Sequence, residues 1–211
     1  MKSIPNILTV LRLLACPLLI YLFEISKTSL FNPIYKWILV IFVLACLTDF
    51  FDGYLARKGN YKTNFGKFLD PIADKALILT MCGLIIVYGG KIINLGLHVI
   101  AFYIIIIRET IVSLLRFNLV DKNKSIDVSL LSKYKTFIQM LAIGGLIIIF
   151  IGLNLPLNLQ IFFISFVKLL IWLSAFVTAI TGVQHFKTYL KLKKWHNYQM
   201  TVSNIVKKEF H

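Results

Sequence analysis

Four aspartates interrupt an otherwise apolar chain within residues 49–75, which read DFFDGYLARKGNYKTNFGKFLDPIADK. Asp49 and Asp52 are three positions apart, and Asp70 and Asp74 are four positions apart. On a helix, each pair therefore shares one face, with its Cβ atoms about 5–6 Å apart. Charged carboxylates in or beside apolar helices are energetically costly and by default mark a functional site. Two such pairs, brought together by a tight turn, predict a site for divalent metal.

The composition around this segment is that of a membrane protein. Of the 211 residues, 58% are hydrophobic and only 15% are charged, whereas soluble domains carry about 25% charged residues. The net charge of +14 at pH 7 would also suit a nucleic-acid-binding protein. However, Lys and Arg cluster between the apolar segments, as they do in the cytoplasmic loops of membrane proteins. We therefore expect contact with membrane lipid and no nucleic-acid partner.

Six apolar runs approach the length of about 20 residues that a membrane-spanning helix needs. They cover residues 7–23, 34–56, 68–88, 95–117, 134–153 and 159–186. The fold class predicted is all-α, an integral membrane bundle of six transmembrane helices. We expect one domain over residues 1–190, followed by a basic cytoplasmic tail over residues 191–211. The tail sequence fits either a segment lying on an anionic leaflet or a disordered end.

The placement of Lys and Arg predicts the orientation of the bundle. Most of these residues lie in segments 57–67 and 118–135 and after residue 186. The alternate connections hold only Lys27, Lys36 and Lys91. Because positive loops stay inside, we expect both termini and the aspartate segment at the cytoplasmic face.

The aspartates also fit two other interpretations. An aspartate pair near a helix end often caps a neighbouring helix or pairs with a lysine such as Lys67 or Lys75. This explains one pair, but poorly explains four carboxylates with two glycines and an arginine in this order. An ion-coupled transporter also uses intramembrane carboxylates, but transporters tend to hold them near the bilayer midplane between repeated halves. Here the cluster straddles a connection between helices and occurs once.

The residues between the aspartates suit a diphosphate ligand. Gly53 and Ala56 are small enough to let a ligand or another helix approach the backbone. Arg57 is always protonated and donates paired hydrogen bonds to phosphate oxygens. Carboxylates with few other ligands suit a hard cation such as Mg²⁺, which also takes substrate phosphate oxygens.

The whole segment resembles one family signature at every fixed position. It fits Asp-x2-Asp-Gly-x2-Ala-Arg-x8-Gly-x3-Asp-x3-Asp and thereby resembles the CDP-alcohol phosphatidyltransferases. The resemblance implies an enzyme that binds a CDP-linked lipid and displaces CMP with the hydroxyl of a second substrate. It implies that Asp49, Asp52 and Asp70 bind two divalent ions, Mg²⁺ or Mn²⁺, and that Asp74 is the general base and also touches metal. The residues implied to line the cytidine diphosphate site are Gly53, Ala56, Arg57 and Gly66.

Other segments resemble the phosphatidylglycerophosphate synthases within this family. The opening run IPNILTVLRLLACPLLIYLF, residues 4–23, matches a pattern that these enzymes share with cardiolipin synthases, at Pro5, Asn6, Thr9 and Arg12. Asn6 and Thr9 are expected beside the CDP-lipid. The stretches IIIIRETIVSLLRF and VSLLSKYKTFIQM, residues 104–117 and 128–140, also resemble the bacterial synthases.

This resemblance implies glycerol 3-phosphate, a small dianion, as the acceptor. The basic residues expected to bind its phosphate are Arg108, Arg116, Lys133 and Lys135. The alternative for each lysine is an ordinary residue of a positive cytoplasmic loop. Arg108 lies about two turns inside its span, and we expect it to point toward the site or an aspartate. Glu109 is not expected to face it, because adjacent residues on a helix diverge.

The function predicted is therefore transfer of a phosphatidyl group from CDP-diacylglycerol to glycerol 3-phosphate, with release of CMP. Within the family the alternative is a cardiolipin synthase with phosphatidylglycerol as acceptor, and outside it an ion-coupled transporter. The resemblance also implies a homodimer in a bacterial-type inner membrane, with its active site at the cytoplasmic face.

Overall fold

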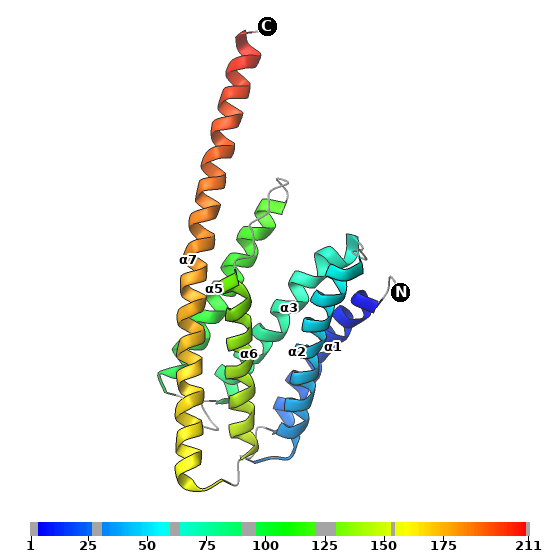
Figure 1. Ribbon diagram of the computed structural model, residues 1–211, viewed down its shortest axis with the longest axis vertical. Coiled ribbons are helices and arrows are strands. Elements are labelled where there is room, and N and C mark those ends of the chain that lie inside the picture. The colour runs from blue at the N-terminus through cyan, green and yellow to red at the C-terminus, as the bar shows by residue number, and fades with distance from the viewer. Residues whose placement is uncertain are drawn as a thin grey trace.

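The computed structural model describes residues 4–26, 31–59, 64–89, 96–120, 130–152 and 155–209, and all of their regular structure is helical. Side chains are described for residues 7–26, 31–48, 72–73, 75–89, 96–115, 134–152 and 155–191. The helices are α1 (Ile4–Ser26), α2 (Ile34–Gly59), α3 (Asn64–Leu84), α5 (His98–Val120), α6 (Leu130–Ile151) and α7 (Leu157–Glu209) (Figure 1). A π-helical turn, η1 (Ile85–Gly89), continues α3. Each of the six apolar runs has become a helix, which confirms the all-α fold.

Four of these helices contain a stretch long and apolar enough to cross a membrane. The stretches are Ile7–Ser26, His98–Leu115, Tyr134–Ile151 and Leu157–Lys191. The apolar stretches within α2 and α3–η1 are shorter in the part of the chain that the structure describes, namely Ile34–Thr48 and Lys75–Gly89. These two helices are the ones that carry the aspartates. The structure therefore shows four candidate spans and two shorter apolar helices of the six spans expected.

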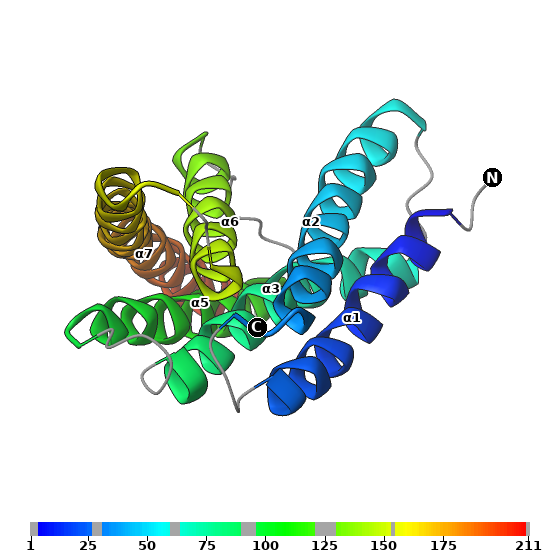
Figure 2. The same cartoon turned by 90° about the horizontal axis from the view of Figure 1, so that it is seen from below.

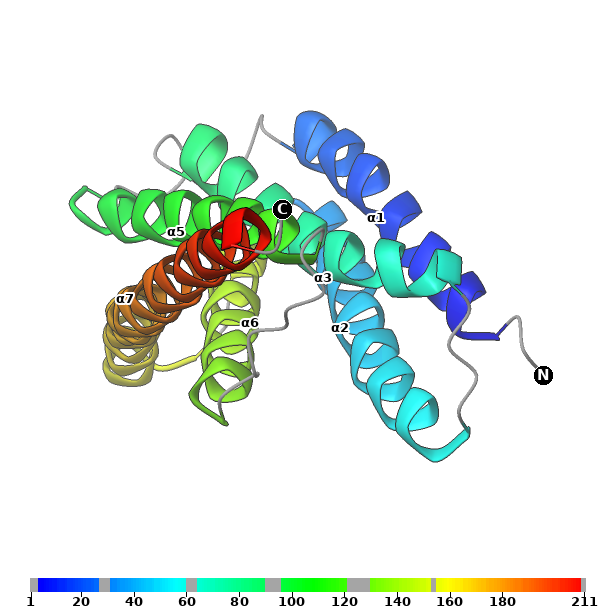
Figure 3. The same cartoon turned by 90° about the horizontal axis from the view of Figure 1, so that it is seen from above.

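The helices form two groups that meet along the bundle. α1 packs against α2 and α3, and α7 packs against α5 and α6. Contacts between α3 and α5 and between α2 and α6 join the groups. Seen along the long axis, α1 and α2 lie on one side and α6 and α7 on the other, with α5 alongside α7 (Figures 2 and 3). α3 contacts α1 in the first group and α5 in the second. The ends of α2 and α5 and the starts of α3 and α6 lie toward the upper part of Figure 1, the end at which α7 finishes.

One face of α1 packs into the core of the bundle. Its buried residues Cys16, Leu19 and Phe23 recur at intervals of three and four, which places them on one face. Phe23 and Tyr35 meet edge to face at 5.9 Å between ring centroids. The outward faces carry large exposed apolar side chains such as Phe162 and Phe176, as expected of helices surrounded by lipid.

The last helix is longer than the sequence predicted. α7 contains 53 residues and is about 80 Å long at 1.5 Å per residue. It continues without a break past residue 190 and extends well beyond the other helices (Figure 1). The division into a domain and a separate tail at that residue stays a prediction.

Candidate active site

The aspartate segment lies on two consecutive helices. Asp49 and Asp52 belong to the C-terminal part of α2, and Asp70 and Asp74 belong to α3. Because the backbone at these positions is helical, the spacing of each pair places its two residues on the same face of their helix. Carboxylate oxygens are the ligands that a hard divalent cation prefers, so these four residues remain the predicted metal ligands. The side chains themselves lie outside the described part of the chain, as do those of Asn6, Gly53, Ala56, Arg57, Gly66, Arg116 and Lys133.

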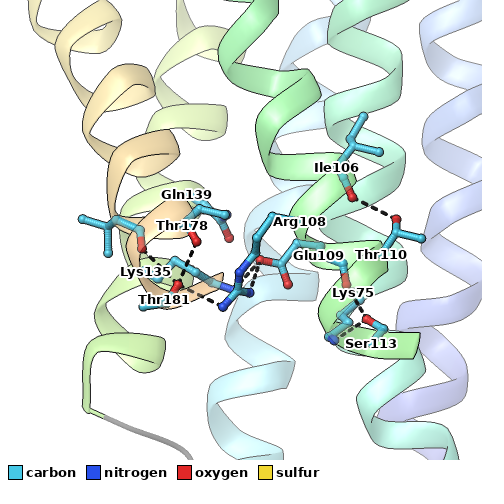
Figure 4. Close-up of polar contacts among 11 residues, drawn as sticks. Lys75, Ile106, Arg108, Glu109, Thr110, Ser113, Lys135, Gln139, Thr178 and Thr181 are labelled. Atoms are coloured by element: carbon cyan, nitrogen blue, oxygen red, sulfur yellow. Dashed lines mark hydrogen bonds and ion pairs between the residues drawn. The ribbon is translucent and has the colours of Figure 1, made fainter. Parts of the chain in front are cut away.

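A polar cluster inside the bundle begins next to the last aspartate. We call it the Glu109 cluster, and it contains Lys75, Arg108, Glu109, Ser113, Lys135, Gln139, Thr178 and Thr181. Figure 4 shows these side chains converging from α3, α5, α6 and α7. Arg108, Glu109 and Lys135 are each less than a tenth exposed. Buried charge at this density is costly unless the charges are paired.

Glu109 is the centre of the pairing. Its Oε1 atom accepts a hydrogen bond from Nη1 of Arg108 at 2.8 Å and another from Nζ of Lys135. The expectation that Arg108 and Glu109 do not face each other is therefore wrong, since the long arginine side chain bends back to its neighbour. The trio of Arg108, Lys135 and Glu109 has a formal charge of +1, and Lys135 makes a further interaction besides the one with Glu109. Arginine and lysine side chains held together in this way can donate hydrogen bonds to a phosphate group.

Lys135 is buried in α6, in contact with Glu109. This position does not fit the alternative of an ordinary loop lysine, which would extend into water. The structure thus brings two of the four residues predicted to bind the acceptor phosphate, Arg108 and Lys135, together in one cluster. The other two, Arg116 and Lys133, belong to α5 and α6.

Arg108 also contacts the last helix. Its Nη2 atom donates to Oγ1 of Thr181 at 2.9 Å. Its Nε atom has no hydrogen-bond partner within the described residues. The guanidinium therefore points between α5 and α7, whereas its predicted approach to an aspartate involves side chains outside the described part.

Lys75 links the aspartate helix to the same cluster. It follows Asp74 directly, and its Nζ atom donates to Oγ of Ser113. Ser113 in turn donates to the backbone carbonyl of Glu109. Polar contacts consequently run from Lys75 on α3, one residue beyond the expected general base, to the backbone of Glu109 on α5.

α1 contributes polar residues on its buried face. Thr9 and Arg12 are almost completely buried. They lie on the same face of α1 as Cys16, nearer the start of the helix. Because α1 packs against α2 and α3, they face the two helices that carry the aspartates. This agrees with the expected place of Thr9 near the CDP-lipid, which stays a prediction.

Thr178 and Thr181 are members of the cluster that sequence reasoning missed. Thr178 accepts a hydrogen bond from Nε2 of Gln139 at 2.9 Å, and Thr181 accepts one from Arg108. A signal was present in the sequence, because polar residues recur at intervals of four, three and four along an apolar helix. That stripe, buried throughout, consists of Ser174, Thr178, Thr181 and His185.

The described side chains contain no group of three histidine, cysteine, aspartate or glutamate residues that could hold a metal ion. The aspartates of α2 and α3 are outside that set. The Glu109 cluster therefore supplies cationic hydrogen-bond donors, whereas the aspartate segment is the candidate metal site.

Comparison with known proteins gives consistent results. The sequence profile of the family described as CDP-alcohol phosphatidyltransferase matches residues 2–181. A protein of Rickettsia bellii is 40% identical over 192 residues, covering 90% of this chain and 97% of the relative. One of Rickettsia typhi is 41% identical over 188 residues, covering 89% and 97%. One of Bacillus subtilis is 35% identical over 158 residues, covering 75% and 76%. All three relatives are named CDP-diacylglycerol–glycerol-3-phosphate 3-phosphatidyltransferase.

Proposed function

The chain belongs to the CDP-alcohol phosphatidyltransferase family, and from that premise we propose that it makes phosphatidylglycerophosphate. The reaction transfers the phosphatidyl group of CDP-diacylglycerol to sn-glycerol 3-phosphate and releases CMP. The observation that carries this choice is the pair of buried cations, Arg108 and Lys135, which meet at Glu109 and suit a small phosphorylated acceptor. The names of the relatives, which align over most of the chain, support the same acceptor.

The metal site proposed consists of Asp49, Asp52, Asp70 and Asp74. Their carboxylates would hold two divalent ions, Mg²⁺ or Mn²⁺. Bound in this place, such ions would neutralise the diphosphate charge and stabilise both the entering and the leaving oxygen.

The cytidine diphosphate is proposed to lie against the same two helices. Arg57 donates paired hydrogen bonds to its phosphate oxygens, while Gly53, Ala56 and Gly66 leave room for the nucleotide. Asn6 and Thr9 approach it from α1.

Asp74 is proposed to act as the general base. Its carboxylate takes the proton of the free primary hydroxyl of glycerol 3-phosphate. The resulting oxygen attacks the phosphorus that bears the diacylglycerol, and the bond from that phosphorus to the CMP oxygen breaks. CMP leaves with the bonding electron pair.

The acceptor phosphate is proposed to bind Arg108, Arg116, Lys133 and Lys135. The burial of Arg108 and Lys135 and their shared contact with Glu109 support this assignment for these two residues. Bidentate hydrogen bonds from arginine suit a phosphate group.

The orientation proposed has six spans, with both termini and the active site at the cytoplasmic face of a bacterial inner membrane. The distribution of basic residues and the alternation of helix direction in Figure 1 support it. The working form is proposed to be a homodimer.

Release of CMP by the purified protein tests this function. CDP-diacylglycerol and Mg²⁺ are supplied with glycerol 3-phosphate, phosphatidylglycerol, inositol phosphate or serine. We expect release only with glycerol 3-phosphate. Release with phosphatidylglycerol would instead identify a cardiolipin synthase, and no release with any acceptor would return attention to an ion-coupled transporter.

A further inference from the structure

The side chain that places Arg108 comes from the last helix. Thr181 accepts a hydrogen bond from Nη2 of Arg108 at 2.9 Å, and both residues are buried. On its other edge, Arg108 donates through Nη1 to Glu109 at 2.8 Å. The guanidinium is consequently held from two sides by two different helices, α5 and α7 (Figure 4).

The direction of the Thr181 hydroxyl is determined by its own helix. A threonine hydroxyl has one proton to donate, and here Oγ1 lies 2.9 Å from the carbonyl oxygen of Val177 and 3.0 Å from that of Thr178. With the proton directed to the backbone, the lone pairs of Oγ1 remain for the arginine. The acceptor that Arg108 meets is therefore fixed rather than rotating.

The next residue on α7 makes the approach possible. A Cβ atom on Gly182 would lie 2.8 Å from Cγ of Arg108 and 3.4 Å from its Nε. Any side chain at this position would push the arginine stem away from α7 and from Thr181. Thr181 and Gly182 thus act as one unit, with a hydrogen-bond acceptor beside a space for the arginine stem.

We propose that Thr181 is a positioning residue for the acceptor, because it fixes the orientation in which Arg108 binds the acceptor phosphate. The inference rests on the proposed function, since it assigns Thr181 a role only through the acceptor site. An arginine has several rotatable bonds, and ordering it costs free energy at each binding event. If Glu109 and Thr181 already hold the arginine in place, less free energy is lost in ordering its side chain when the phosphate binds.

Substitution of Thr181 in the full-length protein tests the proposal. Thr181→Val keeps the shape and removes the hydroxyl, and Thr181→Ser restores it. Loss of a hydrogen bond to a charged group corresponds to about tenfold or more. We expect Thr181→Val to raise KM for glycerol 3-phosphate by that factor, to leave KM for CDP-diacylglycerol within about twofold, and Thr181→Ser to recover most of the loss. The matched control is Thr188→Val on the same helix, where the exposed hydroxyl donates to the Gln184 carbonyl.

A double substitution shows whether Thr181 acts through Arg108. Arg108→Lys keeps the positive charge but lacks the second guanidinium nitrogen that reaches Thr181. In that background we expect Thr181→Val to change KM for glycerol 3-phosphate by less than about twofold, because the interaction is already lost. A full additional effect would overturn the proposal, as would an equal rise in KM for both substrates or a fall in melting temperature without a change in KM.

Failure of the proposed function is distinguishable from failure of this inference. If the wild-type protein releases no CMP with glycerol 3-phosphate, the function itself is wrong. If it does, but Arg108→Lys leaves KM for glycerol 3-phosphate unchanged, the assignment of Arg108 to the acceptor site is wrong, and the role of Thr181 is overturned with it. If Arg108→Lys raises KM and Thr181→Val does not, only the positioning role is wrong.

Discussion

Adjacent residues of opposite charge are the centre of the described site. Arg108 and Glu109 form an ion pair with each other, and Lys135 from another helix completes it. The sequence could identify Arg108 as unusual, because a charge inside an apolar span is costly. It could not identify the partner, because general helix geometry separates neighbouring side chains whereas a long arginine can bend back. The rotamer chosen in the packed bundle decides the contact.

Removing Glu109 tests the balance of charge at the residue scale. Glu109→Ala leaves Arg108 and Lys135 buried beside each other without their common counter-charge. Breaking a buried ion pair in this way costs about 3–5 kcal/mol. We expect a large fall in the midpoint of thermal unfolding of the purified protein in detergent.

The control for that prediction is Glu24→Ala. Glu24 is exposed on α1 and accepts a hydrogen bond from Tyr88, so its loss should cost about 1 kcal/mol or less. Equal losses of stability in the two variants would contradict the central place of Glu109.

The aspartates give the sharpest prediction for activity. Asp49→Ala and Asp70→Ala each remove a proposed metal-binding carboxylate, and we expect both to abolish CMP release and to weaken metal-dependent binding of CDP-diacylglycerol. Asp74→Asn should stop turnover while the CDP-lipid still binds, because an amide cannot accept the proton. Equilibrium binding of labelled CDP-diacylglycerol with and without Mg²⁺ separates the two outcomes. Activity that survives either alanine substitution would overturn the metal assignment.

At the scale of elements, the apolar runs predicted six helices, and the structure contains a helix over each. Apolar length and periodicity determine this much. The extent of α7 was not predictable in the same way, because residues 187–209 are too polar to read as a span and yet continue the helix to Glu209. The buried stripe on α7 was visible as a spacing of polar residues, but only packing shows that Thr181 meets Arg108.

Two neighbouring glycines on α6 test the packing of α6 against α7. A Cβ atom on Gly145 would lie 2.7 Å from Cγ2 of Val167 on α7, whereas one on Gly144 would meet only Phe42, at 3.9 Å. We expect Gly145→Ala to force the two helices apart and to destabilise the protein by about 1–3 kcal/mol. Gly144→Ala is the matched control and should be neutral or slightly stabilising, because alanine favours helix over glycine. Thermal unfolding midpoints of the two variants, measured side by side, check this, and a larger loss for Gly144→Ala would contradict the packing.

At the scale of the whole molecule, the division between polar and apolar surface places the protein in a membrane. The outward faces of its helices are apolar, and four stretches are long enough to cross. The basic residues gather in alternate connections and at the C-terminal end of the chain. Composition alone could predict this arrangement, but no sequence pattern could predict how four helices bring Lys75, Glu109, Lys135 and Thr181 into one cluster.

Reporter fusions test the orientation. A fluorescent protein that folds only in the cytoplasm, joined after residue 211, should be bright if the C-terminus is cytoplasmic. The same reporter inserted in segment 91–95 should be dark, because this connection is predicted on the opposite face. A bright signal at both places, or the reverse pattern, would contradict the proposed topology.

The most direct measurement follows the acceptor itself into lipid. Purified protein is incubated with CDP-diacylglycerol, Mg²⁺ and radiolabelled glycerol 3-phosphate, and the label in the lipid phase is compared with the CMP released. The proposed function predicts one labelled phosphatidylglycerophosphate for each CMP, with both products lost when the metal is chelated. CMP release without label in the lipid, or label transfer that persists without metal, would contradict it.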